Sequence, residues 1–166
     1  MTIKTQITFK DFWNFYLKNF FFKPLPIVAF IVIICYFIKE LISAFQNNFK
    51  NWISLTVLLV IFLFVIFFGF KTYLTTKKAF NSNKKIQENN IYNFTTEKIH
   101  IKGETFESEF NWSSAYKLVE IKDWFLIYHS AQVMNMVPKK YFTKEQILEF
   151  RNIIKSTGVK AKLRKD

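Results

Sequence analysis

The chain has 166 residues, of which 51% are hydrophobic and 20% aromatic, and its formal net charge is +12. A chain of this length that also contains membrane spans has room for only one small soluble domain. Only Arg151 and Arg164 of its 24 basic residues are arginines, which argues against bidentate contacts to phosphate or guanine. We therefore expect no nucleic-acid partner. The single cysteine, Cys35, excludes a disulfide within the chain.

The longest apolar run extends from Trp52 to Phe70 and contains no charged residue. A helix of this length is roughly 28 Å long, close to the ~30 Å hydrocarbon core of a bilayer. An earlier segment, from about 25 to 45, is also long enough, with Lys39 and Glu40 near its outer end. The sequence thus predicts a transmembrane hairpin over 24–70, with spans of about 25–45 and 52–70 and a polar loop between them. A re-entrant or interfacial segment remains the alternative for the first span.

Lysines are concentrated on the outer flanks of this hairpin. Four precede the first span, and five follow the second span before the first acidic residue, Glu88, whereas the intervening loop has Lys50. The positive-inside rule then places both termini in the cytoplasm of a multi-pass protein of the bacterial plasma membrane.

The N-terminal segment, 1–23, is predicted to be amphipathic and interfacial. Its helix, over 8–22, has a capping box at Thr8 and Asp11. Aromatic residues recur there at helical spacing, and together with one tryptophan at the start of the second span they are expected to anchor the chain at the membrane interface. These anchors are Phe9, Phe12, Trp13, Tyr16 and Trp52. A helix that binds a partner is the alternative.

A cytoplasmic domain is predicted over 91–158, after a basic helical linker at 71–90 that continues the second span. Alternation with a period of two over this domain predicts an antiparallel meander of five or six strands. A two-residue turn at Gly103-Glu104 would place His100 opposite Glu107 and Lys98 opposite Glu109. A basic, solvated tail follows at 159–166.

Two further turns in this domain fix the expected register of the later strands. A turn at Lys122-Asp123 pairs 116–121 with 124–129, and a turn at Ser130-Ala131 places Phe125 opposite Met136. A helix is expected to start after Thr143, which has a capping box with Gln146, and to stop at Gly158.

Several motifs of the domain occur in a fixed order. They are Trp112-Ser113-Ser114, the run from Val119 to Tyr128, and Val137-Pro138-Lys139-Lys140-Tyr141-Phe142 before the helix. In this the chain resembles the YcxB-like family, whose members place two membrane helices before a small C-terminal domain. Lys140 stands where the family often has arginine. The resemblance implies a pleckstrin-homology-like domain, a curved antiparallel sheet closed by a C-terminal helix, and brings no catalytic residues.

No constellation of side chains predicts catalysis. His100 is expected to form a surface ion pair with Glu107, and His129 ends a strand as an ordinary polar residue. The two histidines lack a metal-ligand spacing, and three glycines make no phosphate-binding loop. We therefore expect no enzyme, no cofactor and no metal.

Lys139 and Lys140 are the candidate site for an anion or a partner, since they precede a helix N-terminus. A solvated turn that fixes the helix is the alternative. The sequence as a whole predicts an α+β membrane protein without catalytic activity. Its domain would contact a protein or an anionic lipid, and a homo-oligomer remains open. A membrane immunity protein against a toxin or a membrane-active peptide is the second hypothesis.

Overall fold

The computed structural model describes residues 1–21, 23–46 and 52–165. The polar loop predicted after the first span, Phe22 of the predicted N-terminal helix and the last residue of the tail fall outside these ranges. The chain divides into two units, which we call the sheet unit, Met1–Ile7 with Asn83–Asp166, and the helical unit, Thr8–Ser82.

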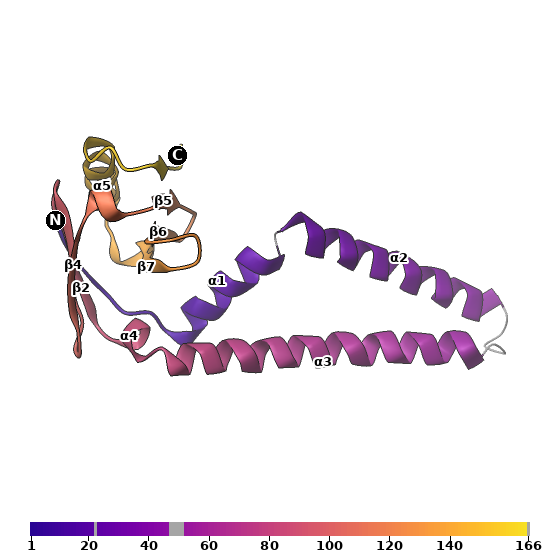
Figure 1. The fold of residues 1–166 in the computed structure, drawn as a ribbon. Helices are drawn as coiled ribbons and strands as arrows, with labels where there is room; N and C mark the ends of the chain where they lie inside the picture. Colours follow the sequence, from indigo (N-terminus) through magenta and orange to yellow (C-terminus); the bar gives the residue numbers. More distant parts are fainter. Residues whose placement is uncertain (22, 47–51, 166) are drawn as a thin grey trace. The chain divides into compact units, whose positions relative to one another are not determined.

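The helical unit consists of α1 (Phe9–Phe21), α2 (Pro24–Gln46) and α3 (Trp52–Ser82) (Figure 1). Helices α2 and α3 are long and apolar enough to cross a membrane, by length and composition, and only 6% of either apolar window is buried. The two predicted apolar helices are therefore present. Helix α3 continues past Phe70 and ends at Ser82, before the end of the linker predicted over 71–90. The capping box of α1 is confirmed, because the Thr8 amide donates to Asp11 Oδ2 at 3.0 Å and the Asp11 amide donates to Thr8 Oγ1 at 3.3 Å.

The sheet unit contains two four-stranded sheets, ordered β1-β2-β3-β4 and β7-β6-β5-β8. The first sheet holds β1 (Thr2–Thr5), β2 (Asn90–Phe94), β3 (Lys98–Lys102) and β4 (Glu107–Asn111). The second holds β5 (Lys117–Glu120), β6 (Trp124–Tyr128), β7 (Met134–Pro138) and the short β8 (Ala161–Lys162). All neighbouring strands are antiparallel except β5 and β8.

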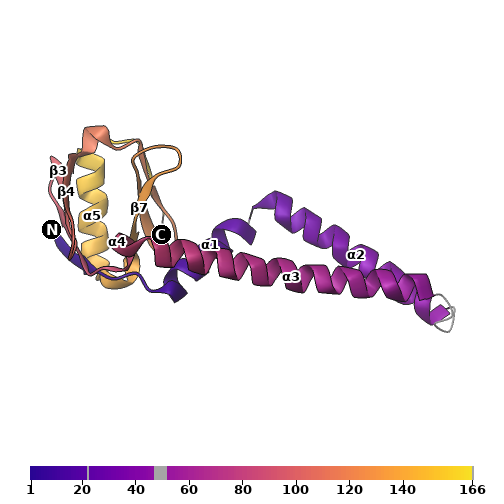
Figure 2. The same ribbon diagram turned by 60° about the horizontal axis from the view of Figure 1, so that its bottom comes forward.

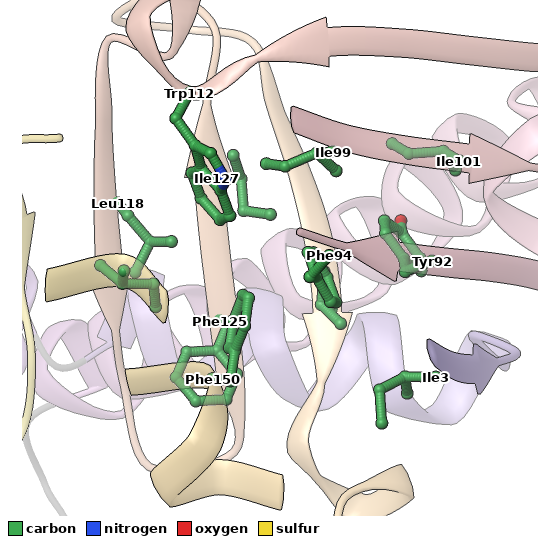
Figure 3. Close-up of a cluster of buried hydrophobic side chains, with 12 residues drawn as sticks. Ile3, Tyr92, Phe94, Ile99, Ile101, Trp112, Leu118, Phe125, Ile127 and Phe150 are labelled. Atoms are coloured by element: carbon green, nitrogen blue, oxygen red, sulfur yellow. The ribbon is translucent and has the colours of Figure 1, made fainter. Parts of the chain in front are cut away.

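Helix α5 (Lys144–Ser156) runs between the two sheets, as Figure 2 shows. Its capping box is confirmed, and Gly158, with φ of 70°, ends the turn that follows it. Phe150 of α5 is fully buried, and its ring centroid lies 4.3 Å from that of Phe94 in the first sheet and 4.7 Å from that of Phe125 in the second. Apolar side chains from both sheets and α5 therefore share one core (Figure 3).

The prediction of one meander was wrong, because the chain leaves the first sheet at Trp112. A single 3-10 turn, η1 (Trp112–Ser114), follows β4 and leads to the second sheet. The Trp112 indole is buried, and its Nε1 donates to the Thr95 carbonyl at 2.9 Å. The Trp112 ring lies 6.3 Å from that of Phe94 and 6.2 Å from that of Phe150, and the strands on either side of it, β4 and β5, belong to different sheets. Strands β1 and β8 were not predicted: β1 falls in the segment predicted to be interfacial, and β8 falls in the tail predicted to be solvated.

The predicted register of β3 and β4 was wrong by two residues. His100 lies opposite Glu109, and Lys102 lies opposite Glu107, so the loop has four residues, 103–106. The Gly103 amide donates to the Phe106 carbonyl at 2.8 Å, which closes that loop. A shift of two keeps each side chain on its face. The expected ion pairs therefore form diagonally, His100–Glu107 at 2.7 Å and Lys98–Glu109 at 3.0 Å.

The β5–β6 register is confirmed, with a hydrogen bond from the Ile121 amide to the Trp124 carbonyl that closes the predicted turn. The β6–β7 register was wrong by one residue, since Phe125 lies opposite Val137 rather than Met136. The cause is a longer loop, in which the Ser130 hydroxyl accepts from the amides of Gln132 and Val133.

Candidate functional site

A buried carboxylate, Glu120 on β5, is the centre of the most extensive polar cluster among the described residues. Burial alternates along β5, so that Glu120 shares the inner face with Leu118. Its side chain is fully buried. Arg151 of α5 binds it in a bidentate manner, with Nε to Oε2 at 2.9 Å and Nη2 to Oε1 at 2.7 Å. Lys139 Nζ donates to Oε1 at 2.6 Å, and the Arg164 amide donates to Oε2 at 3.2 Å. We call these four residues the Glu120 cluster.

This cluster keeps its carboxylate ionised. Burial alone raises the pKa of Glu120, but the hydrogen bonds from Arg151 and Lys139 lower it by more, so the pKa lies below its ordinary value. Two side-chain cations therefore face one carboxylate, and the four donors tie β5 to α5 and to the C-terminal segment. Both carboxylate oxygens of Glu120 accept hydrogen bonds from the protein itself, so the cluster is a structural ion network.

The candidate site at Lys139 and Lys140 lies in η2 (Lys139–Tyr141), between β7 and α5. The Lys139 side chain is only 10% exposed and points to Glu120, while its Nζ also lies 5.2 Å from the centroid of the Phe125 ring. Lys140 is exposed, with Nζ 5.0 Å from the centroid of the Tyr141 ring. The structure thus does not bring the two ammonium groups to one site. Anion or partner binding at these residues stays a prediction.

The predicted interface anchors lie at two places in the helical unit. The rings of Phe9 and Trp13 contact Tyr73 of α3 edge-on, at centroid distances of 5.5 and 5.4 Å. Phe12 contacts Phe80 at 5.5 Å, and Tyr16 stacks on Trp13 at 6.1 Å. The stripe of α1 thus packs on α3. Trp52, by contrast, begins α3 and is 77% exposed.

A second acidic group, Glu88, holds the loop between β3 and β4. Its carboxylate accepts hydrogen bonds from the amides of Glu104 and Thr105, at 2.6 and 2.9 Å, and from the Thr105 hydroxyl at 2.6 Å. The hydrogen bond from the Thr105 hydroxyl contributes most to the lowered pKa of Glu88. A Cβ on Gly103 would lie 2.4 Å from Phe106 Cε1 and 2.6 Å from Glu88 Oε2. A side chain at 103 would therefore displace Phe106 or Glu88.

His100 and His129 have different partners and do not form a common site. His100 pairs with Glu107, whereas His129 Nε2 lies 2.9 Å from Asn135 Nδ2 and its ring contacts Phe110. Across the described ranges, no group of three or more His, Cys, Asp or Glu side chains could hold a metal ion.

The pairing of Glu120 with Arg151 was not predicted from the sequence. The signal was present, because Glu120 occupies an inward position of an alternating strand, where a charged residue needs a partner. Arg151 is one of only two arginines and falls on the apolar stripe of a predicted helix. Nothing in the sequence, however, connects 120 to 151 without knowing how α5 packs.

Comparison with known proteins gives one family. Residues 94–154 match the model of the family described as YcxB-like protein. The "Uncharacterized protein YcxB" of Bacillus subtilis (strain 168) is 27% identical over 123 residues, which is 72% of this chain and 65% of the relative. The match thus spans less than two thirds of the relative's length. No solved structure matches this chain. The matched segment runs from the end of β2 to the last turns of α5 and includes Glu120, Lys139 and Arg151. Residues 94–154 are therefore similar to the YcxB-like family, which confirms for this part of the chain the resemblance seen in the sequence.

Proposed function

We propose that the chain is a non-catalytic integral membrane protein. In this proposal α2 and α3 cross the bacterial plasma membrane, and the sheet unit presents its YcxB-like domain in the cytoplasm to a protein or an anionic lipid. The observation that carries the proposal is the exposed apolar surface of α2 and α3.

On α3 the exposed apolar side chains lie on all sides of the helix and do not form a single stripe. Consecutive α3 residues point about 100° apart, so four of them sample the whole circumference. Phe62, Leu63, Phe64 and Val65 are such a set, and they are 59, 55, 61 and 43% exposed. A helix that packs on one side of a soluble core would alternate exposed polar and buried apolar residues. Apolar exposure on all sides is instead satisfied by lipid chains.

The orientation rests on the charges at the ends of this surface. Lys71, Lys77 and Lys78 lie on α3 beyond its uncharged stretch, and further lysines precede α2. Positive residues are retained on the cytoplasmic side, which favours a cytoplasmic sheet unit. The order of strands followed by α5 supports a pleckstrin-homology-like architecture for that unit, although fold alone does not define a ligand.

Membrane insertion is tested first by fractionation. We expect the full-length protein to stay in the membrane pellet after an alkaline carbonate wash. Release into the supernatant would contradict insertion.

Topology is tested by labelling single cysteines in a Cys35→Ser background. Gln46→Cys lies at the end of α2, and Asn152→Cys lies on an exposed position of α5. A membrane-impermeant maleimide added to intact cells should label Gln46→Cys alone, and lysis should make Asn152→Cys reactive. Labelling of Asn152→Cys before lysis would refute the cytoplasmic placement.

The partner is sought by purifying the full-length protein from its native membranes in mild detergent. A mock purification from membranes without the protein is the control. We expect one stoichiometric protein or an enriched anionic phospholipid. Recovery of neither, from a folded sample, would contradict an interaction domain.

A further inference from the structure

A cavity of about 240 Å³ lies in the sheet unit, lined by residues of both sheets and of the short α4 (Lys84–Gln87). Buried apolar side chains, Ile101 from β3 and Met136 from β7, form part of its wall. Asn90 and Tyr92 of β2 also line it. Their alternation with Phe94 places both side chains on the inner face of the first sheet. Neither the Glu120 cluster nor the site predicted at Lys139 and Lys140 contributes to this cavity.

The Asn90 amide leaves one acceptor without a partner. Its Nδ2 donates to the carbonyls of Lys85 and Glu88, at 3.1 and 3.3 Å, which fixes the orientation of the amide. The residue is 5% exposed, and its Oδ1 is buried with no hydrogen-bond partner among the described residues. Buried carbonyl oxygens are nearly always hydrogen-bonded, so a donor is expected to reach this atom.

Other groups around the cavity indicate what kind of molecule would supply the donor to Asn90 Oδ1. Tyr92 is also buried, and within the described ranges its hydroxyl makes no hydrogen bond to the protein. The exposed Lys85 supplies a cation, with Nζ 5.1 Å from the centroid of the Phe106 ring. The cavity thus has the acceptor of the buried Asn90, the phenol of the buried Tyr92, an apolar wall and the positive charge of Lys85. It is smaller than the sites of about 300–1,000 Å³ that hold drug-sized molecules.

We propose that this cavity binds the glycerophosphate headgroup of an anionic phospholipid. A glycerol hydroxyl donates to Asn90 Oδ1, the phosphate pairs with Lys85, and the glycerol carbons contact Ile101 and Met136. This inference rests on the proposed membrane anchorage, which favours a lipid over a soluble phosphate. Ile7 and Asn83 line the cavity, and they are the residues of the sheet unit that are joined in sequence to the helical unit.

The test uses the full-length protein in mild detergent and native mass spectrometry. Phosphatidylglycerol and phosphatidylcholine of identical acyl chains are added separately, so that only the headgroup differs. We expect preferential retention of phosphatidylglycerol. Lys85→Gln should lower that retention by about three- to fivefold, the effect of one exposed charge pair. Val133→Trp, at an exposed position of the cavity wall, should abolish the preference because the larger side chain takes up space in the cavity.

The matched control is Lys84→Gln, which removes the same charge from the neighbouring exposed residue that does not line the cavity. It should retain the lipid like the parent protein. Equal retention of the two lipids, or equal losses in the Lys84 and Lys85 variants, would overturn the proposal. If free glycerol 3-phosphate at equal concentration displaces the lipid, the ligand is a soluble glycerophosphate and the proposal of a lipid is wrong. If the protein withstands the carbonate wash yet shows no headgroup preference, the cavity proposal fails and the membrane proposal stands.

Discussion

Replacing Glu120 by glutamine should destabilise the sheet unit more than any substitution at an exposed ion pair. The side chain keeps its size, but Arg151 and Lys139 then lie together, only 11 and 10% exposed, without the charge that compensates them. Removing one partner of a buried ion pair costs about 3–5 kcal/mol. For a unit of this size that corresponds to a fall in Tm of at least about 12 °C.

The assay is thermal unfolding of the full-length protein in mild detergent. Trp112 and Trp124 are buried in the sheet unit and report on it by fluorescence, provided that Trp13 and Trp52 are first replaced by phenylalanine. The control is Glu109→Gln, the same substitution in the exposed pair with Lys98, which should cost less than about 1 kcal/mol. Similar Tm values for the two variants would refute the account of the Glu120 cluster as a buried ion network.

Three further outcomes follow from the same contacts. Gly103→Ala should cost about 1–3 kcal/mol in the same assay, because the new methyl group overlaps Phe106, and an unchanged Tm would contradict that packing. Thr143→Ala should cost about 1 kcal/mol by removing the N-cap of α5, whereas Thr143→Ser should restore most of it. The pKa values of Glu88 and Glu120 are lowered in the folded state. Their contribution to the stability of the fold is therefore present above the unfolded carboxyl pKa of about 4.3, and it is lost as the pH falls through the folded pKa values. We therefore expect Tm to fall steeply below about pH 4, and less steeply in Glu120→Gln; parallel curves would contradict the assignment.

The sequence predicts best what short-range patterns determine. The two capping boxes, the β5–β6 turn and the two apolar helices depend on residues that are close in the chain, and all five are confirmed. The β3–β4 register depends on Glu88, which lies outside the hairpin and stabilises a longer loop through the amides of Glu104 and Thr105. A rule for two-residue turns cannot include such a contact. The β6–β7 register failed for a local reason, because the hydroxyl of Ser130 stabilises a loop one residue longer than the expected turn.

The two strands that were not predicted from the sequence, β1 and β8, have partners that lie far away in the chain. β1 pairs Thr2 with Asn93, and β8 pairs Ala161 with Leu118. Neither segment has enough alternating apolar residues to be recognised alone, and each becomes a strand only because a formed edge offers its hydrogen bonds. The same limit applies to the cavity, since the sequence around Asn90 gives no sign that its amide oxygen lacks a donor.

Three residues of the motif from Pro138 to Phe142 take part in packing, and this bears on where function should be sought. Pro138 is fully buried, Lys139 pairs with Glu120, and the Phe142 ring lies 5.4 Å from that of Phe125. Each of these residues joins β7 and the start of α5 to the second sheet. These three residues therefore have a structural role in this chain, whatever it binds. A binding function should therefore rest on groups that the fold does not satisfy. In the part of the chain that the structure describes, Asn90 Oδ1 is the buried side-chain atom that meets this condition. It lies outside residues 94–154, so chains that share the YcxB-like domain can differ in what they bind there.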